Sequence, residues 1–320
     1  MNSLPKVLFT LNVPREHFSA LDGVAELVLP NSHQWNVIPR SDLLLLIADC
    51  DAFISQAEVM VDREFLDAGK NLKMVANVAM GVDNFDLAEL TRRGIPATNT
   101  PDAFAESAAD LTLGLILSVT RRIAEADRFI RSGNWDKIGL QPRRWEGALV
   151  GGKTLGLIGY GRIAKLVEKR AAAFGLNVIH TRQQASDHPK CRSFDELIAE
   201  SDIVVVLVPL TGETRHLIDA RALAAMKPGV VFINVARGRV MDETAVVEAL
   251  RAGHLAGAGL DVFENEPAVH PDLFEMNNVV MTPHIGGATD EERRRGRREA
   301  AEEVARFFRG EPLQYSVNSV

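Results

Sequence analysis

The sequence contains little cysteine, no long hydrophobic run and no excess of positive charge. Its two cysteines, Cys50 and Cys191, are too few for a disulfide framework, and their spacing fits no metal site. The longest apolar stretches, such as residues 203–210, are far shorter than the roughly 20 residues that span a bilayer. The first residues lack the charged and apolar regions of a signal peptide. These absences argue against a secreted, disulfide-rich or membrane protein, and we expect a reduced, cytoplasmic location.

The balance of charge is slightly acidic. The chain has 43 acidic and 36 basic residues, a formal net charge of -7, which argues against nucleic acid or an anionic membrane as the main partner. One basic run, residues 293–298, lies between acidic residues at 291–292 and 299, so that opposite charges alternate along a predicted helix. We therefore expect this run to be a solvated helix face, and we expect neither a nucleic-acid nor a membrane partner.

The hydrophobic content is that of an ordinary soluble protein. With 320 residues, of which 46% are hydrophobic, the chain exceeds the usual size of one domain and can bury two cores. In the first third of the chain, short apolar runs alternate with helical patterns. The predicted strands are 6–10, 52–55 and 74–78, and the predicted helices are 62–68 and 86–93. Strands that alternate with helices imply a parallel sheet.

The same alternation returns after a different middle segment. Residues 106–132 predict one long, largely buried helix between two domains, and residues 135–152, which contain glycines and a proline, predict the crossing into the second domain. From residue 153 the pattern is strand, helix, strand, with a final helix over residues 290–309. The predicted strands are 154–160, 177–181, 203–208, 230–235, 256–262 and 279–282. Apolar runs of this kind are typical of a parallel sheet whose two faces are both covered.

A glycine loop follows the first strand of this second set. Gly159, Gly161 and Ala164 stand between the strand and a helix whose apolar residues share one face. The first glycine allows a tight turn, the second lets the backbone approach a pyrophosphate, and the small Ala164 lets the helix pack on the strand. The pyrophosphate would meet free N–H groups and the positive end of the helix that Arg162 and Ile163 open. This context favours a dinucleotide over a glycine turn without a ligand.

The residue after the next strand bears on which dinucleotide is bound. An acidic residue normally accepts hydrogen bonds from the ribose hydroxyls at that point. Here the strand over residues 177–181 is followed by Arg182, Gln183 and Gln184, and no acidic residue occurs before Asp187. Because a cation suits a 2′-phosphate, we predict NADP rather than NAD. The alternative is a solvated arginine beside bound NAD.

Charged or titratable side chains follow three of the late predicted strands. They are Arg237, Glu266 and His284. The carboxyl ends of parallel strands lie at one edge of a sheet, where open α/β sheets bind ligands. We therefore expect the three side chains to form one site, although each taken singly could be a surface charge, a loop carboxylate or a turn histidine.

Several motifs, in one order, resemble those of the D-isomer-specific 2-hydroxyacid dehydrogenase family over essentially the whole chain. The motifs are residues 154–163, 208–211, 234–238, 259–267 and 283–287. The resemblance implies an α/β fold of two doubly wound parallel-sheet domains. A Rossmann-type dinucleotide-binding domain, residues 102–286, would be inserted in a flavodoxin-like substrate-binding domain made of residues 1–101 and 287–320.

The resemblance also implies roles for single residues. Arg237, Glu266 and His284 match the family's catalytic residues, and Asp261 matches the acid near the nicotinamide. Reduction of a 2-oxo acid places negative charge on the carbonyl oxygen, to which a protonated His284 can donate a proton. Glu266 would favour the imidazolium, and Arg237 would bind the substrate carboxylate through its planar fork of donors. This chemistry requires no metal, and we predict none.

Two further sets of residues complete the predicted site. Residues 78–84 resemble the family's substrate loop, whose backbone N–H groups bind the substrate carboxylate, and Gly81 would allow a close approach; a plain turn at the strand end is the alternative. The predicted substrate-binding residues are Ala79, Met80, Gly81, Arg237 and His284. The predicted cofactor-binding residues are Gly159, Gly161, Arg162, Ile163, Arg182, Pro209, Val235, Ala236, Asp261, Gly286 and Gly287.

Within the family, the chain most resembles the glyoxylate/hydroxypyruvate and 2-ketogluconate reductases. Together with Arg182, this resemblance implies an enzyme, an NADP-preferring reductase that converts a small 2-oxo acid of the glyoxylate, hydroxypyruvate or 2-ketogluconate type to the D-2-hydroxy acid. One alternative is an NAD(P)-sensing, corepressor-like binding protein on the same fold. Another is an NAD-dependent phosphoglycerate- or formate-type dehydrogenase. The resemblance further implies a homodimer, with residues 106–132 and 135–152 as the contact. The other histidines are expected to be structural or at the surface.

Overall fold

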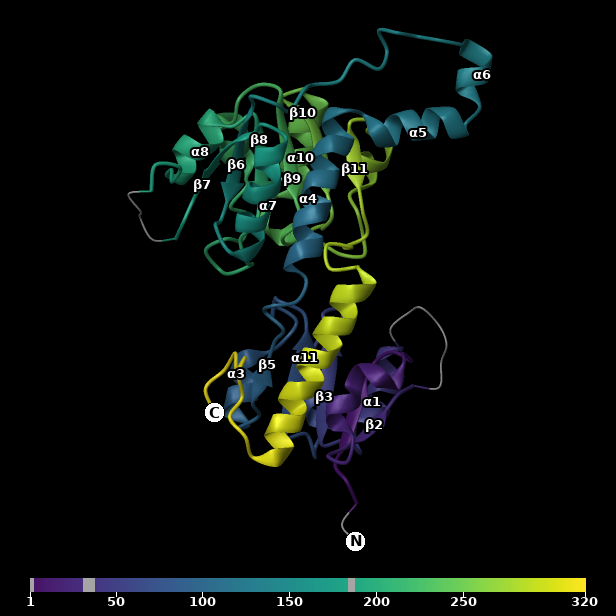
Figure 1. Ribbon diagram of the computed structural model, residues 1–320, viewed down its shortest axis with the longest axis vertical. Helices are drawn as coiled ribbons and strands as arrows, with labels where there is room; N and C mark the ends of the chain where they lie inside the picture. The colour runs from purple at the N-terminus through teal and green to yellow at the C-terminus, as the bar shows by residue number, and fades with distance from the viewer. Residues whose placement is uncertain (1–2, 31–37, 184–187) are drawn as a thin grey trace. The chain divides into compact units, whose positions relative to one another are not determined.

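The computed structural model describes residues 3–30, 38–183 and 188–320. The chain folds as two compact units. Unit 1 consists of Met1–Phe104 and Gly287–Val320, and unit 2 is Ala105–Gly286, so unit 2 interrupts the sequence of unit 1 (Figure 1). Within the described ranges, no helix is both long and apolar enough to cross a membrane.

Unit 1 is built on a five-stranded sheet with the order β2-β1-β3-β4-β5. All neighbouring strands pair in parallel. The two longest strands, β3 and β4, are buried along their whole length because helices cover both faces of the sheet. The strands are β1 Lys6–Phe9, β2 Glu26–Val28, β3 Ala52–Gln56, β4 Met74–Val78 and β5 Ala97–Thr98.

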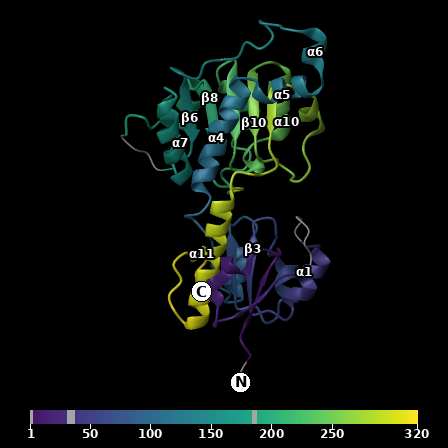
Figure 2. The same cartoon turned by 45° about the vertical axis from the view of Figure 1, so that its right-hand side comes forward.

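Each face of this sheet has its own apolar core. One core contains side chains of α1 (Arg40–Ile47), α2 (Arg63–Ala68) and α3 (Leu87–Arg92). The other contains side chains of the 3-10 helix η1 (Arg15–Leu21) and of α11 (Asp290–Arg309). Figure 2 shows α11 running along β3, and it also packs on β4. Sequence signals set the ends of α11, since the Thr289 side chain accepts from the Glu292 N–H and Gly310 closes the helix at a φ of 70°.

The basic run on α11 is only partly solvated, so the expectation for residues 293–298 is wrong at two positions. Gly296 and Arg297 are buried. The guanidinium carbon of Arg297 lies 5.9 Å from the centroid of the Phe9 ring, and its Nη1 is 3.3 Å from Nδ1 of His17. Because an α-helix has 3.6 residues per turn, some residues of a long charged run must face the sheet. Arg297 is one of them, and its side chain is buried in unit 1.

Unit 2 is built on a six-stranded parallel sheet with the order β11-β10-β9-β8-β6-β7. The strand order reverses between β6 and β8, whose carboxyl ends therefore flank the point where doubly wound sheets bind ligands. The strands are β6 Thr154–Ile158, β7 Asn177–His180, β8 Ile203–Val206, β9 Val230–Asn234, β10 Leu255–Leu260 and β11 Val279–Met281.

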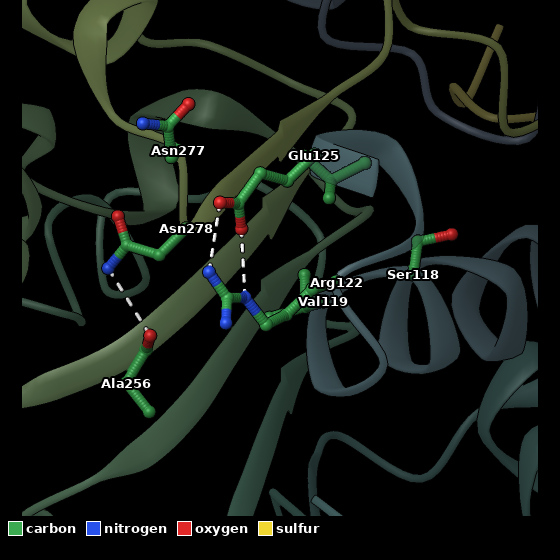
Figure 3. Close-up of a pocket in the computed structure, with 8 residues that line it drawn as sticks. Ser118, Val119, Arg122, Glu125, Ala256, Asn277 and Asn278 are labelled. Atoms are coloured by element: carbon green, nitrogen blue, oxygen red, sulfur yellow. Dashed lines mark hydrogen bonds and ion pairs between the residues drawn. The ribbon is translucent and has the colours of Figure 1, made fainter. Parts of the chain in front are cut away.

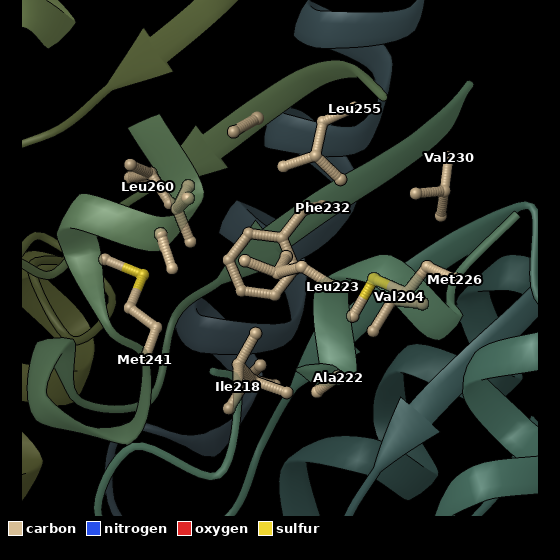
Figure 4. Packing of buried hydrophobic residues seen from close by; sticks show 14 of the residues in the cluster. Val204, Ile218, Ala222, Leu223, Met226, Val230, Phe232, Met241, Leu255 and Leu260 are labelled. Carbon is tan, nitrogen blue, oxygen red and sulfur yellow. The ribbon is translucent and has the colours of Figure 1, made fainter. Parts of the chain in front are cut away.

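Helices cover both faces of this sheet as well. On one face, α4 (Ala105–Thr120) and α7 (Arg162–Ala173) share a core with the strands. On the other face, α8 (Phe194–Glu200), α9 (Ala220–Ala225) and α10 (Glu243–Arg251) pack around Phe232, which Figure 4 shows at the centre of this second core. Two 3-10 helices, η2 (Gly238–Val240) and η3 (Pro271–Glu275), complete the unit. The predicted fold class, two doubly wound parallel-sheet α/β domains, is confirmed.

The single long helix predicted for residues 106–132 is wrong. The structure has α4, which ends at Thr120, and a separate α5 (Ile123–Arg131), with Arg122 between them at a φ of 55°. The carbonyl oxygen of Thr120 accepts from the N–H of Ala148, and a side chain on Gly147 would lie 2.5 Å from that oxygen. The segment at Gly147 and Ala148 thus occupies the position at which α4 would have continued.

An arm extends from the body of unit 2. It consists of α5, the short helix α6 (Asn134–Ile138) and the loop that returns to β6, and both Figure 1 and Figure 2 show it projecting away from the sheet. The loop predicted for residues 135–152 therefore contains a helix at its start. Strands β2 and β5 and helix α1 were not predicted, because they are short or lack a clear hydrophobic period.

Candidate active site

The glycine loop lies at the carboxyl end of β6, beside the reversal of strand order. Gly159 has a φ of 96°, and a side chain there would lie 2.9 Å from Cγ1 of Val208 and 3.0 Å from the carbonyl oxygen of Leu207. Its N–H donates to Oγ1 of Thr181 at 2.9 Å. Only glycine fits this conformation and this space, so Gly159 holds the turn against the neighbouring strand β8.

The helix after the loop presents an open N-terminus. Gly161 precedes α7, and nothing lies within 4 Å of the place where its side chain would be. Arg162 begins the helix and is exposed, whereas Ile163 and Ala164 pack toward the core beneath the loop. Free N–H groups at the start of a helix bind phosphate oxygens. The glycine loop and α7 therefore fit the pyrophosphate of a dinucleotide.

The remaining predicted cofactor residues of the central strands lie along the same edge of the sheet. Pro209 is exposed in the loop after β8, and its carbonyl oxygen accepts from Oγ1 of Thr214 at 2.6 Å. Val235 and Ala236 follow β9, the first buried and the second half-buried. All of these residues follow the carboxyl ends of strands that neighbour β6 or β8, as a ligand at the reversal point requires.

Arg182 lies beyond the edge strand β7 and is exposed. Its guanidinium carbon is 4.9 Å from the centroid of the Tyr160 ring. Gln183 is exposed as well, whereas Gln184 and Asp187, which the cofactor prediction also considered, lie outside the described residues. A cation therefore stands after β7 where a ribose-binding carboxylate is usual.

Glu266 and His284 form a hydrogen-bonded pair in unit 2. Nδ1 of His284 lies 2.8 Å from Oε2 of Glu266, and Oε1 of Glu266 accepts from the N–H of Phe263 at 2.9 Å. The hydrogen bond to Glu266 raises the pKa of His284 above its ordinary value, against the opposing effect of burial. Burial alone would raise the pKa of Glu266, but the hydrogen bond and charge of His284 lower it. The pair is therefore poised as a carboxylate and an imidazolium.

Arg237 belongs to the same cluster. Its positive charge lowers the pKa of both Glu266 and His284. The Asn234 side chain shapes the turn that carries Arg237, because it accepts from the N–H of Ala236 and donates to the carbonyl oxygen of Arg237, both at 3.0 Å. The three predicted catalytic side chains thus follow β9, β10 and β11. They lie close enough for the charge of Arg237 to affect the pKa of the other two.

Gly238 explains how the Arg237 turn approaches the segment before Glu266. A side chain at position 238 would lie 1.8 Å from the carbonyl oxygen of Phe263 and 2.5 Å from the backbone nitrogen of Glu264. No substitution fits such a contact between two backbones. The glycine therefore brings the turn after β9 directly against the loop after β10.

Asp261 organises the loop that carries His284. It is fully buried. Its Oδ1 accepts from Oγ1 of Thr282 at 2.5 Å and from the N–H of Ile285 at 2.8 Å, and its Oδ2 accepts from the N–H of Gly286 at 2.8 Å. Burial raises the pKa of Asp261. The structure thus gives Asp261 a loop-anchoring role in addition to the contact with the nicotinamide that was predicted for it.

His284 itself has a left-handed backbone, with a φ of 52°. Its N–H donates to the carbonyl oxygen of Asp261 at 2.8 Å. Residues other than glycine adopt this conformation at a cost and usually need surrounding support. The Asp261 carboxylate supplies that support, because it binds Thr282 before His284 and the N–H groups of Ile285 and Gly286 after it.

The predicted substrate loop lies in unit 1, after β4. The carbonyl oxygens of Ala79, Met80 and Gly81 each accept a hydrogen bond. Ala79 accepts from the backbone of Thr100 at 3.0 Å, Met80 from the Asn99 side chain at 2.7 Å and Gly81 from the Asn77 side chain at 2.8 Å. Because their acceptors are engaged within unit 1, these peptide groups keep a fixed orientation.

The two glycines after His284 fall in different units. Gly286 is the last residue of unit 2 and is buried beside Asp261. Gly287 begins the second segment of unit 1. A side chain at position 287 would lie 2.8 Å from Cδ1 of Phe104. The Phe104 ring thus leaves no room for a side chain at position 287.

A cavity of about 350 Å³ lies elsewhere in unit 2 and contains none of the predicted site residues. Figure 3 shows the Arg122–Glu125 ion pair in this cavity, and the Asn278 side chain donating to the carbonyl oxygen of Ala256. Ala256 and Asn278 lie at the amino ends of β10 and β11, whereas ligands of doubly wound sheets bind at the carboxyl ends. The catalytic cluster therefore lies apart from this cavity.

The described residues support neither a reactive thiolate at Cys50 nor a metal site. Burial raises the pKa of the Cys50 thiol to about 11, so the reactive thiolate is scarce at neutral pH. Across the described ranges, the structure brings together no group of three or more His, Cys, Asp or Glu side chains that could hold a metal ion.

Three contributors to the site were missed from the sequence. Asn234, Thr181 and Thr282 hold the Arg237 turn, the glycine loop and the Asp261 carboxylate, respectively. Each follows or ends a strand at the ligand-binding edge, and this position is the signal that could have identified them.

The fold and the cluster define a class of protein, an oxidoreductase that uses a nicotinamide dinucleotide. The family model described as "D-isomer specific 2-hydroxyacid dehydrogenase, NAD binding domain" matches residues 113–286. The chain belongs to the D-isomer-specific 2-hydroxyacid dehydrogenase family.

Individual relatives agree with this assignment. A glyoxylate reductase of Thermococcus onnurineus is 43% identical over 300 residues, which are 89% of this chain and 87% of the relative. The crystal structure of a glyoxylate reductase from Paecilomyes thermophila has a TM-score of 0.86 at 32% identity and covers 99% of both chains. An NADPH-dependent glyoxylate/hydroxypyruvate reductase from Sinorhizobium meliloti, solved with NADP and malonate, has a TM-score of 0.84 at 30% identity, with 98% of this chain and 97% of that chain covered.

Proposed function

We propose that the protein reduces a small 2-oxo acid, of the glyoxylate or hydroxypyruvate type, to the D-2-hydroxy acid with NADPH. The observation that carries the proposal is the His284–Glu266 pair, 2.8 Å apart, in the positive field of Arg237. A protein that only senses dinucleotides would need the glycine loop but not a proton donor. The relatives that are glyoxylate reductases support the same substrate class.

The chemistry assigns a role to each side chain. When bound, the cofactor supplies a hydride to the carbonyl carbon of the 2-oxo acid. Nδ1 of His284 is held by Glu266, so Nε2 is the atom that donates a proton to the carbonyl oxygen as negative charge develops there. In the reverse direction the neutral ring accepts the proton from the hydroxyl group.

Substrate binding is assigned to Arg237 and to residues 79–81. The planar guanidinium can bind the substrate carboxylate in bidentate fashion and place a positive charge near the carbonyl oxygen. The hydrogen bonds to the carbonyl oxygens of Ala79 and Met80 fix the peptide planes that carry the N–H groups of Met80 and Gly81, which supports the proposal that N–H groups of this loop receive the carboxylate. Arg237→Ala should raise KM strongly and also lower kcat.

NADP is the proposed cofactor because of Arg182. An exposed guanidinium after β7 can bind a 2′-phosphate through charge-assisted hydrogen bonds, and the carboxylate that would accept the ribose hydroxyls of NAD is missing from the described part of this strand end. NAD is the alternative, since the similar solved structures include one bound to NADP and one bound to NAD.

Steady-state kinetics test the proposed function. Oxidation of NADPH and NADH is followed with glyoxylate, hydroxypyruvate and 2-ketogluconate as substrates. We expect turnover with glyoxylate or hydroxypyruvate and a higher kcat/KM with NADPH. Tight cofactor binding without turnover of any 2-oxo acid would instead favour the dinucleotide-sensing protein, and equal use of the two cofactors would contradict the role of Arg182.

A homodimer formed through the arm of unit 2 is also proposed. The arm exposes large apolar side chains, among them Leu140 at 82% and Leu149 at 80%, and Phe129, Trp135 and Trp145 line a small apolar cavity within it. Apolar surface gathered on a projecting segment is typical of an interface, and the family resemblance indicates a second copy as the occupant.

Analytical ultracentrifugation tests the dimer. Leu140→Asp should shift the protein toward the monomer, whereas Leu45→Asp, at an exposed leucine of unit 1, should leave the mass unchanged. A monomeric parent protein, or a dimer that Leu140→Asp and Leu149→Asp together do not weaken, would contradict this interface.

A further inference from the structure

Two rings and a guanidinium are stacked at the edge of the sheet of unit 2. The ring centroids of Tyr160 and His180 are 3.6 Å apart, and the ring planes are inclined by 13°. The guanidinium carbon of Arg182 lies 4.9 Å from the centroid of the same Tyr160 ring. Tyr160 belongs to the glycine loop, and His180 ends β7, so the stack joins the loop that fits the pyrophosphate to the residue that determines the proposed cofactor choice.

The Tyr160 ring is fixed by contacts other than the stack. Its hydroxyl group donates to Oε2 of Glu168 on α7, and Oε1 of Glu168 accepts from Nζ of Lys190 at 2.6 Å. The hydrogen bond to Glu168 raises the pKa of Tyr160, which keeps the phenol protonated and able to donate. The ring cannot turn away without breaking the hydrogen bond to Glu168 and leaving His180.

His180 stacks on the Tyr160 ring, and its ring nitrogens form no hydrogen bond within the described residues. Its side chain is fully buried. Burial and the charge of Arg182 lower the pKa of His180, so the ring is neutral. His180 thus packs on Tyr160 as a flat, uncharged ring.

A ring suits Arg182 better than a carboxylate would. The face of an aromatic ring attracts a guanidinium but leaves its N–H donors free, whereas a carboxylate would occupy the fork that binds phosphate. Within the described part of the chain, Arg182 forms no ion pair. An exposed arginine without the ring would also have to lose rotamer freedom on binding.

We propose that Tyr160 is a positioning residue for cofactor choice, which holds the Arg182 guanidinium at the end of β7 in the arrangement that receives a 2′-phosphate. The inference rests on the proposed NADP preference and deepens it. Tyr160 acts through Arg182 and needs no contact with the cofactor of its own. Removal of the ring should therefore weaken ligands that carry a 2′-phosphate and leave other ligands nearly unchanged.

Calorimetric titration of NADP+, NAD+ and 2′,5′-ADP tests this inference without turnover. Tyr160→Leu removes the ring, and we expect its Kd for NADP+ and for 2′,5′-ADP to rise about tenfold, equivalent to about 1.4 kcal/mol. The Kd for NAD+ should change less than about twofold. Tyr160→Phe keeps the ring but loses the hydrogen bond to Glu168, and its Kd for NADP+ should rise less than that of Tyr160→Leu.

A double-mutant cycle with Arg182→Ala separates positioning from a general structural role. In the Arg182→Ala background, Tyr160→Leu should cause no further loss of NADP+ affinity. If Tyr160→Leu weakens NADP+ and NAD+ equally, or changes neither while Arg182→Ala weakens NADP+, the inference is wrong although the proposed NADP preference stands. If the parent binds NADP+ no more tightly than NAD+, the preference itself fails and the inference fails with it.

The phenylalanine variant keeps the test decisive if Tyr160→Leu does not fold. Tyr160→Phe and Glu168→Gln both loosen the ring without removing a buried volume. Each should raise the Kd for NADP+ by about two- to threefold and leave the Kd for NAD+ unchanged. A loss of NAD+ affinity as large as that of NADP+ in either variant would overturn the inference.

Discussion

The carboxyl edge of the sheet in unit 2 has two functional regions that are held very differently. At the catalytic region, Glu266 binds both His284 and the backbone of Phe263, and the buried Asp261 holds the loop around His284 through three hydrogen bonds. At the β7 edge, the Arg182 side chain is exposed and is held mainly over one ring. The residues proposed for the chemistry are thus held by many strong contacts, and the residue proposed for cofactor choice by few weak ones.

This difference follows from what each region must do. Proton transfer depends steeply on distance and direction, so the donor must be held close to its productive geometry. Discrimination of a 2′-phosphate needs only a cation within reach. On the proposed function, we therefore expect a single substitution at the β7 edge to change cofactor choice, and we expect the catalytic region to tolerate little change.

His284→Ala tests the first half of the comparison and should have the largest effect. Loss of the general acid should lower kcat by about 10²- to 10⁴-fold. The Kd for NADPH should stay close to that of the parent, because no part of the glycine loop is altered. Steady-state kinetics and a fluorescence titration of NADPH measure the two quantities. A variant that loses cofactor affinity while keeping kcat would contradict the proton-donor role.

Glu266→Gln should have the next largest effect and should alter the pH profile. A hydrogen bond to a charged group is worth about 1.5–3 kcal/mol, so kcat/KM should fall about 10- to 100-fold at neutral pH. Glu266 raises the pKa of His284, and reduction needs the protonated ring. The rate of reduction is therefore lost as pH rises through this pKa.

Removal of the carboxylate lowers that pKa, so the loss should begin at lower pH in the variant. The pH dependence of kcat/KM for reduction, measured for parent and variant, checks the direction. Oxidation of the hydroxy acid needs the neutral ring, and its rising limb should shift to lower pH as well. A profile that keeps the parent's midpoint would show that Glu266 does not act through His284.

Arg182→Asp tests the second half of the comparison. The new carboxylate should repel a 2′-phosphate and accept hydrogen bonds from ribose hydroxyls, so kcat/KM with NADPH should fall by about tenfold or more while the value with NADH rises. The same charge change at the exposed Arg221 on α9 provides the control and should leave the ratio unchanged. A ratio that responds equally to both variants would mean that only net charge matters.

The fold was predictable because its signals are local and repeated. The apolar runs of β6, β8 and β9 each indicate a strand with two covered faces, and the caps of α11 define its ends. The structure also brings Glu266 and His284 into contact, as their places after two strands indicated.

Other features depend on contacts between distant residues and could not be predicted. The break after α4 requires Ala148 to reach the carbonyl oxygen of Thr120. The burial of Arg297 depends on Phe9 and His17 from the other end of the chain. Sequence patterns describe one element at a time and contain no information about such approaches. The roles of the single site residues stay predictions until they are measured.

His180→Phe should have the smallest effect and extends the comparison to stability. The buried ring nitrogens of His180 have no partner within the described residues, and an unsatisfied buried polar group costs about 1–3 kcal/mol. A phenylalanine ring keeps the stack on Tyr160 but is slightly larger, which offsets part of this gain. We expect the free energy of unfolding to change by less than about 1 kcal/mol. NADP+ affinity should also be retained, since the flat surface under Tyr160 remains.

His254→Phe is the matched control, because Nε2 of His254 lies 2.9 Å from the carbonyl oxygen of Leu223. The substitution leaves the carbonyl oxygen of Leu223 without the His254 donor. It should therefore lower the free energy of unfolding by about 1 kcal/mol. Urea denaturation of the two variants measures both values. If His180→Phe were the more destabilising of the two, the ring nitrogens of His180 would be engaged in the folded protein. The β7 edge would then be held by more than stacked rings, and the contrast with the catalytic region would be weaker.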